Sequence, residues 1–548
     1  MQRLICIHGH FYQPPRDNPW SGRVERQPSA APFHDWNQRI TEECYGPNAA
    51  AKVLDREGRV VRTVDNYAYV SFDFGPTLLA WLAAERPEVY AAVIAADRRS
   101  RRRFSGHGSA MAQAYHHTIL PLASPRDRRT EVRWGIADFR HRFGRQPEGL
   151  WLPETAVDTA TLELLAAEGV RFTVLEPHQA ARWRPLPQPE DGTGAGEAWI
   201  ELASGQSLDT CEPYLCRLPS GAEIALFFYD GPLSRDVAFN GLLHDGVHFA
   251  RRLHERGEAC GAWSGEALDG GATGGGAGGL LSIATDGETY GHHHRFGEMA
   301  LARALTLIDD YDGTRLTCFA EHLARHPPRR QVEVRDGTSW SCPHGVGRWS
   351  RDCGCGRETG SHQRWREPLR EALLWLRDAL AAPWQEAAGE LLADPWAARD
   401  GYVRLLLDPS PASEEAFFAE HAARALDGEE RHRARRLLEV QRNALRMFTS
   451  CGWFFEDVAR IETVQVMLYA VRALELAGEL TGADLEVGFL ERLAAVPAND
   501  PRDGDARTVC LRQADAARRL ARQGGGAGGA GASPARSLPA GGGEATSP

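Results

Sequence analysis

The chain has 548 residues, which at about 150 residues per domain allows two to four domains. Its 43% hydrophobic and 25% charged residues are typical of a folded globular protein, and without an apolar run of about 18 residues we expect no membrane span. The net charge of −11, from 63 basic and 74 acidic residues, argues against nucleic acid or an anionic membrane as the main partner.

Residues 1–330 alternate short apolar runs with longer amphipathic stretches, a pattern typical of parallel strand–helix units. The expected strands are Leu4–Ile7, Val70–Phe72, Leu150–Leu152, Phe172–Leu175, Ile224–Tyr229 and Leu280–Ala284. Several of them end in polar side chains: His8, His10, Glu154, Glu176, Asp230, Asp286 and Glu288. A closed barrel gathers its C-terminal strand ends around one site, whereas an open doubly wound sheet concentrates ligands at one or two loops. The repetition favours an α/β barrel over an open sheet.

The segment from 366 to 522 is predicted to be all-α. Pro368–Leu380, Glu414–Leu426 and Glu429–Phe448 carry apolar residues at helical spacing, with Arg and Glu on the other face. Two low-complexity stretches, Gly270–Gly279 and the tail from Gly524, cannot bury apolar surface and are predicted to be disordered. We therefore divide the chain into a barrel (1–335), a helical domain (336–522) and a disordered Gly/Ala/Pro tail (523–548).

The cysteines and the N-terminus predict a cytoplasmic protein. Eleven cysteines in so long a chain do not indicate a disulfide framework, and their odd number leaves at least one unpaired. The N-terminus has no basic region, and its apolar run Leu4–Ile7 is too short for a signal peptide.

The pair His8-Gly-His10 follows the first predicted strand. Side chains two residues apart on a strand point to one face, here into the barrel mouth. The alternative is a turn made by Pro14 and Pro15, in which the histidines bond only to backbone groups.

Two acids are expected at the ends of later strands. In Trp151-Leu-Pro-Glu154 a carboxylate lies near an aromatic ring, and such rings suit the apolar faces of sugars. The alternative for Glu154 is a favourable charge near the start of the following helix. Asp230 follows three aromatic residues and precedes Gly231, so its alternative is an ordinary turn residue.

The segment Asp286-Gly-Glu288-Thr-Tyr-Gly-His292-His293-His294 contains two acids and three histidines within nine residues. Carboxylates and imidazoles are metal ligands, so this segment also suggests a metal site.

Together and in this order, these segments resemble family 57 of the glycoside hydrolases. The similar motifs are the His-Gly-His…Gln-Pro start, His-x-Ile-x-Pro-Leu at His117, Trp-Leu-Pro-Glu at Glu154, Phe-Tyr-Asp…Leu-Ser at Asp230 and Asp-Gly-Glu-Thr-Tyr at Asp286. The connector Ser339–Cys355 and the stretch Thr449–Phe455 resemble a bacterial subfamily whose C-terminal half is a helical domain of unknown function.

The resemblance implies an incomplete (β/α)7 TIM-like barrel, with the helical domain capping its mouth. It also implies a retaining mechanism on α-glucans, by hydrolysis or transglycosylation, of the α-amylase, glucanotransferase or branching type. Glu154 matches the nucleophile and Asp230 the general acid/base, and such a pair needs carboxyl groups about 5–5.5 Å apart. Asp230 must then be protonated near neutral pH, and its aromatic neighbours could supply the apolar setting that raises its pKa.

The resemblance and the residue types also give a set of substrate-binding candidates. They are His8, His10, His117, Trp151, Asp286, Glu288, His292, Trp340, His344 and Trp349. His10 and His117 match positions near the cleavage point, and the tryptophans are candidate stacking platforms. The expected partner is a neutral polysaccharide or oligosaccharide, with no nucleic acid, no membrane and no required cofactor; the sequence does not predict an oligomeric state.

The connector also holds four potential metal ligands, Cys342, His344, Cys353 and Cys355. They could hold a structural zinc ion, although their spacing is not that of a standard finger or ribbon. Alternatively, His344 reaches the sugar site and the cysteines are buried as small apolar residues.

Two other functions compete with the glucan-acting enzyme. A metal-dependent carbohydrate deacetylase would use metal-bound water at a site built from His8, His10, Asp286 and His292–His294. A glucan-binding regulatory protein would have a barrel without catalysis, against which the presence of both carboxylates argues.

Overall fold

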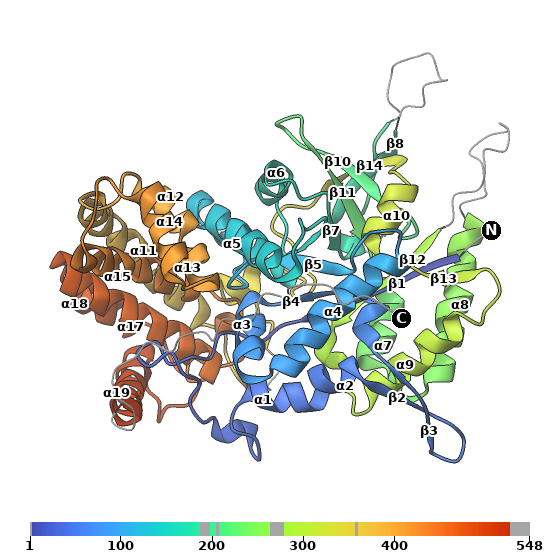
Figure 1. Cartoon of the computed structure of the whole chain (residues 1–548), viewed down its shortest axis with the longest axis horizontal. Helices are drawn as coiled ribbons and strands as arrows, with labels where there is room; N and C mark the ends of the chain where they lie inside the picture. The colour runs from blue at the N-terminus through green and yellow to red at the C-terminus, as the bar shows by residue number, and fades with distance from the viewer. Residues whose placement is uncertain are drawn as a thin grey trace, which may run out of the picture.

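The computed structural model describes residues 3–186, 198–203, 206, 208–263, 279–356 and 360–525. The stretches predicted to be disordered, Gly270–Gly279 except for Gly279 and the tail beyond Gly525, lie outside the described residues. Figure 1 shows the two parts of the chain side by side, strands with their helices in blue to yellow and a group of helices in orange to red.

Seven parallel strands form an incomplete barrel. They are β1 (Arg3–Phe11), β4 (Ser71–Phe74), β5 (Ala110–Gln113), β6 (Leu150–Trp151), β7 (Phe172–Leu175), β11 (Glu223–Phe228) and β12 (Leu280–Asp286). One sheet has the order β12-β1-β4-β5-β6, and β11 pairs with β7. In the described part of the chain, an isolated bridge from Gly149 to Phe172 connects the starts of β6 and β7. A bond from the Asp230 N–H to the Ser282 carbonyl (2.7 Å) connects the end of β11 with β12. The predicted incomplete (β/α)7 barrel is confirmed.

β1 lies at the centre of this arrangement. β12 pairs with one of its edges along residues 4–10, and β13 (Thr314–Leu316) and β4 share the other edge. The residues from Leu4 to Phe11 are all buried, as expected for a parallel strand covered on both faces. The register aligns His10 with Asp286 on one side and with Asp73 on the other. Three titratable side chains therefore lie at one level near the barrel mouth.

Helices cover the outside of the barrel (Figure 1). They are α3 (Pro76–Glu85), α4 (Pro87–Arg103), α5 (Pro125–Phe143), α6 (Thr159–Ala167), α7 (Gly231–Phe239), α8 (Gly246–Trp263), α9 (Gly297–Ile308) and α10 (Phe319–Arg325). The short helices α1 (Trp36–Ile40) and α2 (Gly46–Ala49) and the hairpin of β2 (Ala51–Leu54) and β3 (Val60–Val64) belong to the segment between β1 and β4.

A second sheet, which the sequence did not predict, extends the barrel beyond β7 and β11. It adds β10 (Tyr214–Arg217), β14 (Arg330–Val334), β8 (Ala180–Pro185) and β9 (Ile200–Glu201). A disulfide between Cys211 and Cys260 joins the segment before β10 to α8, and the other nine cysteines are free. A single disulfide is not a disulfide framework, as expected from the sequence. The pairing of Cys211 with Cys260 was not predicted, because 49 residues separate the two cysteines.

The C-terminal part is helical, as predicted. It comprises α11 (Arg366–Gly389), α12 (Pro395–Gly401), α13 (Val403–Leu407), α14 (Pro411–His421), α15 (Gly428–Arg446), α16 (Cys451–Phe454), α17 (Ile461–Thr481), α18 (Glu486–Leu493) and α19 (Ala506–Gly525). Its core contains large buried side chains such as Leu376, Trp384 and Leu437. In the described ranges, no helix is long and apolar enough to span a membrane.

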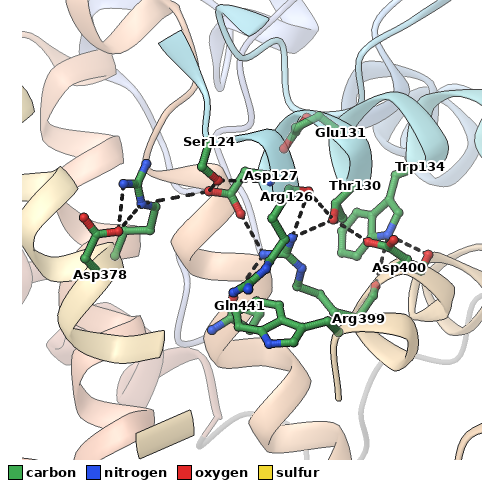
Figure 2. Close-up of polar contacts among 12 residues, drawn as sticks. Ser124, Arg126, Asp127, Thr130, Glu131, Trp134, Asp378, Arg399, Asp400 and Gln441 are labelled. Carbon is green, nitrogen blue, oxygen red and sulfur yellow. Dashed lines mark hydrogen bonds and ion pairs between the residues drawn. The ribbon is translucent and has the colours of Figure 1, made fainter. Parts of the chain in front are cut away.

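A buried polar network fixes the helical part to α5 of the barrel (Figure 2). The Arg399 guanidinium of α12 donates to Asp127 and Thr130 of α5, both at 2.7 Å, and to Gln441 of α15 at 3.2 Å. In return, the Trp134 indole N–H of α5 donates to the Arg399 carbonyl at 3.1 Å. Arg399 is 1% exposed, so this charge depends on Asp127 for compensation.

We expect Arg399→Met to lower the free energy of unfolding by about 3–5 kcal/mol, because it leaves the Asp127 carboxylate without its buried partner. The matched control is Arg133→Met, which also removes an arginine bonded across this interface, to Asp400, but one with a half-exposed side chain. Its expected cost is about 0–1 kcal/mol. Urea unfolding followed by tryptophan fluorescence measures both. Equal effects of the two substitutions would contradict the role given to Arg399.

Candidate active site

A cavity of about 850 Å³ lies at the C-terminal ends of the barrel strands. The barrel lines it with His10, Glu154, Glu176, Tyr229, Asp286 and Glu288. Trp340 and Ser341 line it from the connector, and Cys451, Phe454, Phe455 and the residues from Ala459 to Glu462 from the helical part. The cavity is therefore built by both parts of the chain, where a barrel of this type carries its chemistry.

Glu154 has a strained backbone held in place by the connector. It follows the two-residue strand β6 with φ +57° and ψ 22°, in the left-handed region. Such a conformation costs on the order of 1–3 kcal/mol and persists only where surrounding contacts enforce it. Here the Glu154 carbonyl accepts the Trp340 backbone N–H (3.1 Å), while its Oε2 accepts the Trp340 indole N–H (3.1 Å) and the Ser341 hydroxyl (2.7 Å).

The surroundings of the Glu154 carboxylate act on its pKa in both directions. Burial raises the pKa, and the nearby Asp286 charge raises it further; the bonds from Ser341 and Trp340 and the charge of His10 lower it, with a net increase. Glu154 and Asp286 both line the cavity.

A chain of hydrogen bonds runs from Asp73 through two histidines to the helical part. His10 Nδ1 lies 2.8 Å from Asp73 and its Nε2 lies 3.1 Å from His117 Nε2, and His117 Nδ1 lies 2.6 Å from the Ser450 hydroxyl. Burial opposes the charged form of His10, but Asp73, Asp286 and Glu288 outweigh it and raise its pKa to about 9. Burial and the His10 charge lower the pKa of His117 well below its usual value. Protonated His10 therefore donates to both Asp73 and neutral His117.

Three of the predicted substrate-binding residues lie behind the cavity wall. His8 is fully buried and bonds to Asp73 and Ser71, both at 3.1 Å. Trp151 is also fully buried, with its ring 4.5 Å from that of His8 and 5.3 Å from that of His10. His117 is 1% exposed and lies against Tyr12 and His10. They support His10 instead of lining the cavity, because the barrel interior is filled with layers of side chains.

Asp230 does not line the cavity. Its side chain caps α7, accepting the Leu233 N–H at 2.9 Å with one oxygen and the Arg256 guanidinium of α8 at 2.5 Å with the other. Both oxygens are thus used in holding α7 and α8. The three aromatic residues before Asp230 were expected to form an apolar setting around a catalytic acid. Instead, Phe227 and Phe228 belong to the buried core, and Tyr229 alone of the three lines the cavity.

Asp286 and Glu288 both line the cavity but differ in their surroundings. Asp286 is the only exposed residue of β12, and the register places it opposite His10. Glu288 is 6% exposed, and its Oε1 accepts the Tyr45 hydroxyl (2.5 Å) and the Tyr12 N–H (3.1 Å). Burial raises the pKa of Glu288 to about 7. Glu288 is therefore part of the wall, while Asp286 is exposed to the same cavity that Glu154 lines.

The remaining candidates divide into cavity residues and others. Trp340 and His292 line the cavity, with His292 paired to Glu43. Trp349 is fully buried in the core of the helical part, and His344 lies outside the cavity, 3.3 Å from the Cys355 sulfur. Both were expected to contact substrate, but packing and the neighbouring cysteines hold them elsewhere.

The ligand set suggested for a deacetylase does not gather in one place. Among the residues that the structure describes, one group of His, Cys, Asp or Glu side chains could share an ion: Cys342, His344, Cys353 and Cys355. His292 pairs with Glu43, and His294 Nε2 donates to the Ala238 carbonyl at 2.8 Å.

Several cavity residues had no signal in the sequence. Arg460 and Glu462 come from the helical part, more than 100 residues from the connector, and only tertiary packing brings them to the barrel. Phe239 is 77% exposed on the cavity rim, as the last residue of α7. Ser341 could have been found, because it directly follows Trp340.

Comparisons with known proteins agree with this architecture. Residues 102–335 match the sequence model described as Glycosyl hydrolase family 57, and residues 362–523 match Domain of unknown function (DUF3536). No curated protein matches the chain by sequence.

Solved structures resemble the fold at low sequence identity. An exo-type maltose-forming amylase from Pyrococcus sp. ST04 has a TM-score of 0.60 at 16% identity, with 90% of this chain and 83% of that chain covered. A GH57 branching enzyme from Thermococcus kodakaraensis has a TM-score of 0.54 at 15% identity, with coverages of 95% and 96%. One from Pyrococcus horikoshii has 0.52 at 14%, with 90% and 89%. At these identities the similarity establishes the fold.

Proposed function

We propose that the chain is a retaining enzyme that cleaves α-glucans through a covalent glycosyl-enzyme intermediate, since residues 102–335 match the sequence model of glycosyl hydrolase family 57. The observation that carries this proposal is that two carboxylates from barrel strand ends, Glu154 and Asp286, line one cavity. The names of the structurally similar amylase and branching enzymes support α-glucans as the substrate class.

Glu154 is the nucleophile in this proposal. Trp340 and Ser341 both donate to its Oε2, which fixes the carboxylate plane and leaves Oε1 to attack the anomeric carbon. These donors and the positive charge of His10 favour the ionised form that attack requires, against the effect of burial. The strained backbone adds to this positioning, because it holds the side chain at the end of β6.

Asp286 is the general acid/base, a role that we transfer from Asp230. A retaining enzyme needs its acid close to the nucleophile, so that it can protonate the departing oxygen and then activate the acceptor. Asp286 lines the same cavity as Glu154, whereas both oxygens of Asp230 bond to the Leu233 backbone and to Arg256. Trp340, Tyr229 and Phe239 offer aromatic surface to the sugar rings.

Reaction with amylose tests the stereochemistry and the substrate class together. We expect the first product detected by proton NMR to be the α-anomer, because two displacements at the anomeric carbon restore its configuration. The same samples, analysed for new reducing ends and new branch points, distinguish hydrolysis from transfer. A β-anomer as first product would refute the retaining mechanism, and no product from any α-glucan would refute the substrate class.

A further inference from the structure

The connector between β14 and α11 brings together four side chains that the glucan chemistry does not use. Cys342, His344, Cys353 and Cys355 each offer one ligand atom, and these atoms all lie within 4.8 Å of one another. Cys342 is buried, Cys353 and Cys355 are partly buried, and His344 is exposed. The group lies near the surface, where an ion can enter.

The distances within this group fit a metal centre better than a disulfide. The Cys342 sulfur lies 3.9 Å from that of Cys353 and 3.8 Å from that of Cys355, while His344 Nδ1 lies 3.3 Å from the Cys355 sulfur. A tetrahedron with Zn–S bonds of about 2.3 Å has S–S edges of about 3.8 Å. Disulfide sulfurs are only about 2.05 Å apart. The spacing is therefore that of four ligands around one ion.

We propose that Cys342, His344, Cys353 and Cys355 bind one Zn²⁺ ion that fixes the connector beside Glu154. Three thiolates and one imidazole form a tetrahedral donor set that zinc prefers. The three thiols release their protons to solvent on binding, which leaves the complex with one negative charge. Arg366 lies next to it, with its guanidinium 3.8 Å from the Cys353 sulfur, and is itself fully buried.

The backbone of the connector is shaped for this cluster. Gly354, between Cys353 and Cys355, has φ +75°, a conformation that side chains other than glycine rarely adopt. At Gly347 an added Cβ would meet the Cβ atoms of Cys353 at 3.1 Å and of His344 at 3.4 Å. Glycine at these two positions lets the ligands approach one another.

The cluster is directly continuous with the catalytic wall. Cys342 follows Ser341, which bonds to Glu154, and the Ser341 carbonyl accepts Arg348 at 3.4 Å. Arg348 also donates to the Phe454 carbonyl at 2.9 Å. Zinc would therefore hold together the connector, Glu154 and the cavity wall from the helical part. The binding of the ion does not depend on the proposed function; its effect on Glu154 does.

Metal analysis of the full-length protein tests the site. We expect purification under reducing conditions, without chelator, to give one zinc per chain by mass spectrometry of the metal content. Cys353→Ser combined with Cys355→Ser should abolish zinc binding, and His344→Ala, which changes an exposed side chain, should weaken it at least about tenfold. Cys510→Ala, a buried free cysteine of α19, is the matched control and should keep one zinc.

Two further measurements test zinc binding without relying on enzyme activity or on whether the cysteine variants fold. Cobalt added to the metal-free wild-type protein should give the visible absorption of a tetrahedral thiolate centre, and His344→Ala should alter that spectrum. Zinc removal should speed hydrogen exchange in residues 338–356 and 153–157. Zinc binding to the stripped wild type no tighter than to Cys353→Ser/Cys355→Ser, or a disulfide joining Cys342 to Cys353 or Cys355 under reducing conditions, would overturn the proposal. Zinc binding without glucan turnover would refute only the proposed function.

Discussion

Glu154→Ala is expected to lower kcat on α-glucans by about 10⁴-fold or more while the protein stays folded. At about 1.36 kcal/mol per factor of ten, this corresponds to a loss of roughly 5.5 kcal/mol of transition-state stabilisation. The reason is that the other cavity carboxylates have other roles or partners. Asp286 is needed as the acid, and Glu288 is bonded into the wall through Tyr45 and Tyr12. Glu176 pairs with His178, and Glu462 pairs with Arg16. Circular dichroism and glucan turnover measure the two parts of this expectation.

Adding azide to Glu154→Ala should give a product that identifies the missing nucleophile. With the side chain shortened, azide can enter the space of the missing carboxylate and attack an activated α-glycosyl substrate directly. A single displacement inverts the configuration, so Glu154→Ala with azide should release the β-glycosyl azide. The matched control is Glu148→Gln, a carboxylate from the segment just before β6 that pairs with His107 and Arg171 away from the cavity, and it should keep full turnover. Full turnover in the Glu154→Ala variant would exclude Glu154 as the nucleophile.

The predicted barrel strands could be found because each is a continuous apolar run in a sheet covered on both faces. β5 was missed because Ala110-Met-Ala-Gln113 contains no β-branched or aromatic residue, although all four residues are buried. The second sheet was missed for another reason. Its strands β10, β14 and β8 pair across more than 100 residues, and local periodicity carries no information about such pairing.

Among the helices, the difference between prediction and structure is one of length. The predicted segment ends at Leu380, three residues before Pro383, and proline removes a helical hydrogen bond. α11 nevertheless continues to Gly389, since Trp384 and Ala388 extend its buried face into the core. Tertiary packing therefore outweighed the local preference.

In the candidate site, the local sequence also did not predict in which direction the acidic side chains point. Asp230 comes just after a strand and Asp286 ends one, and each precedes a glycine, so the local pattern does not distinguish them. After Asp230 the helix α7 begins at once, and its free N–H groups capture the carboxylate as a cap. After Asp286 comes only a short 3-10 turn (Gly287–Thr289), whose start the side chain does not cap. The element that follows each strand decides which acid faces the cavity.

Asp286→Ala is therefore expected to lower kcat on glucans by about 10²–10⁴-fold, the usual contribution of a positioned general acid/base. A substrate with a good leaving group needs no protonation in the first step, so the loss should be much smaller for its glycosylation. Azide should then accelerate breakdown of the glycosyl-enzyme and release the α-glycosyl azide, the opposite anomer from that of Glu154→Ala. Determining the anomeric configuration of the two azide products by proton NMR thus assigns both roles in one experiment.

Asp230→Asn tests whether Asp230, instead of Asp286, is the general acid/base. Asparagine is also a good helix cap, so α7 keeps its N-terminal hydrogen bond to Leu233 and only the ion pair with Arg256 is lost. If Asp230 serves the structure alone, turnover should fall by less than about tenfold, with no azide rescue and an unchanged pH profile, while Asp286→Ala loses the alkaline limb of kcat/KM. The reverse pattern, with rescue by azide at position 230 and not at 286, would return the acid/base role to Asp230. It would also require Asp230 to leave its bonds with Leu233 and Arg256 during turnover, because a carboxylate bonded on both oxygens to α7 and α8 cannot deliver a proton to a sugar in the cavity.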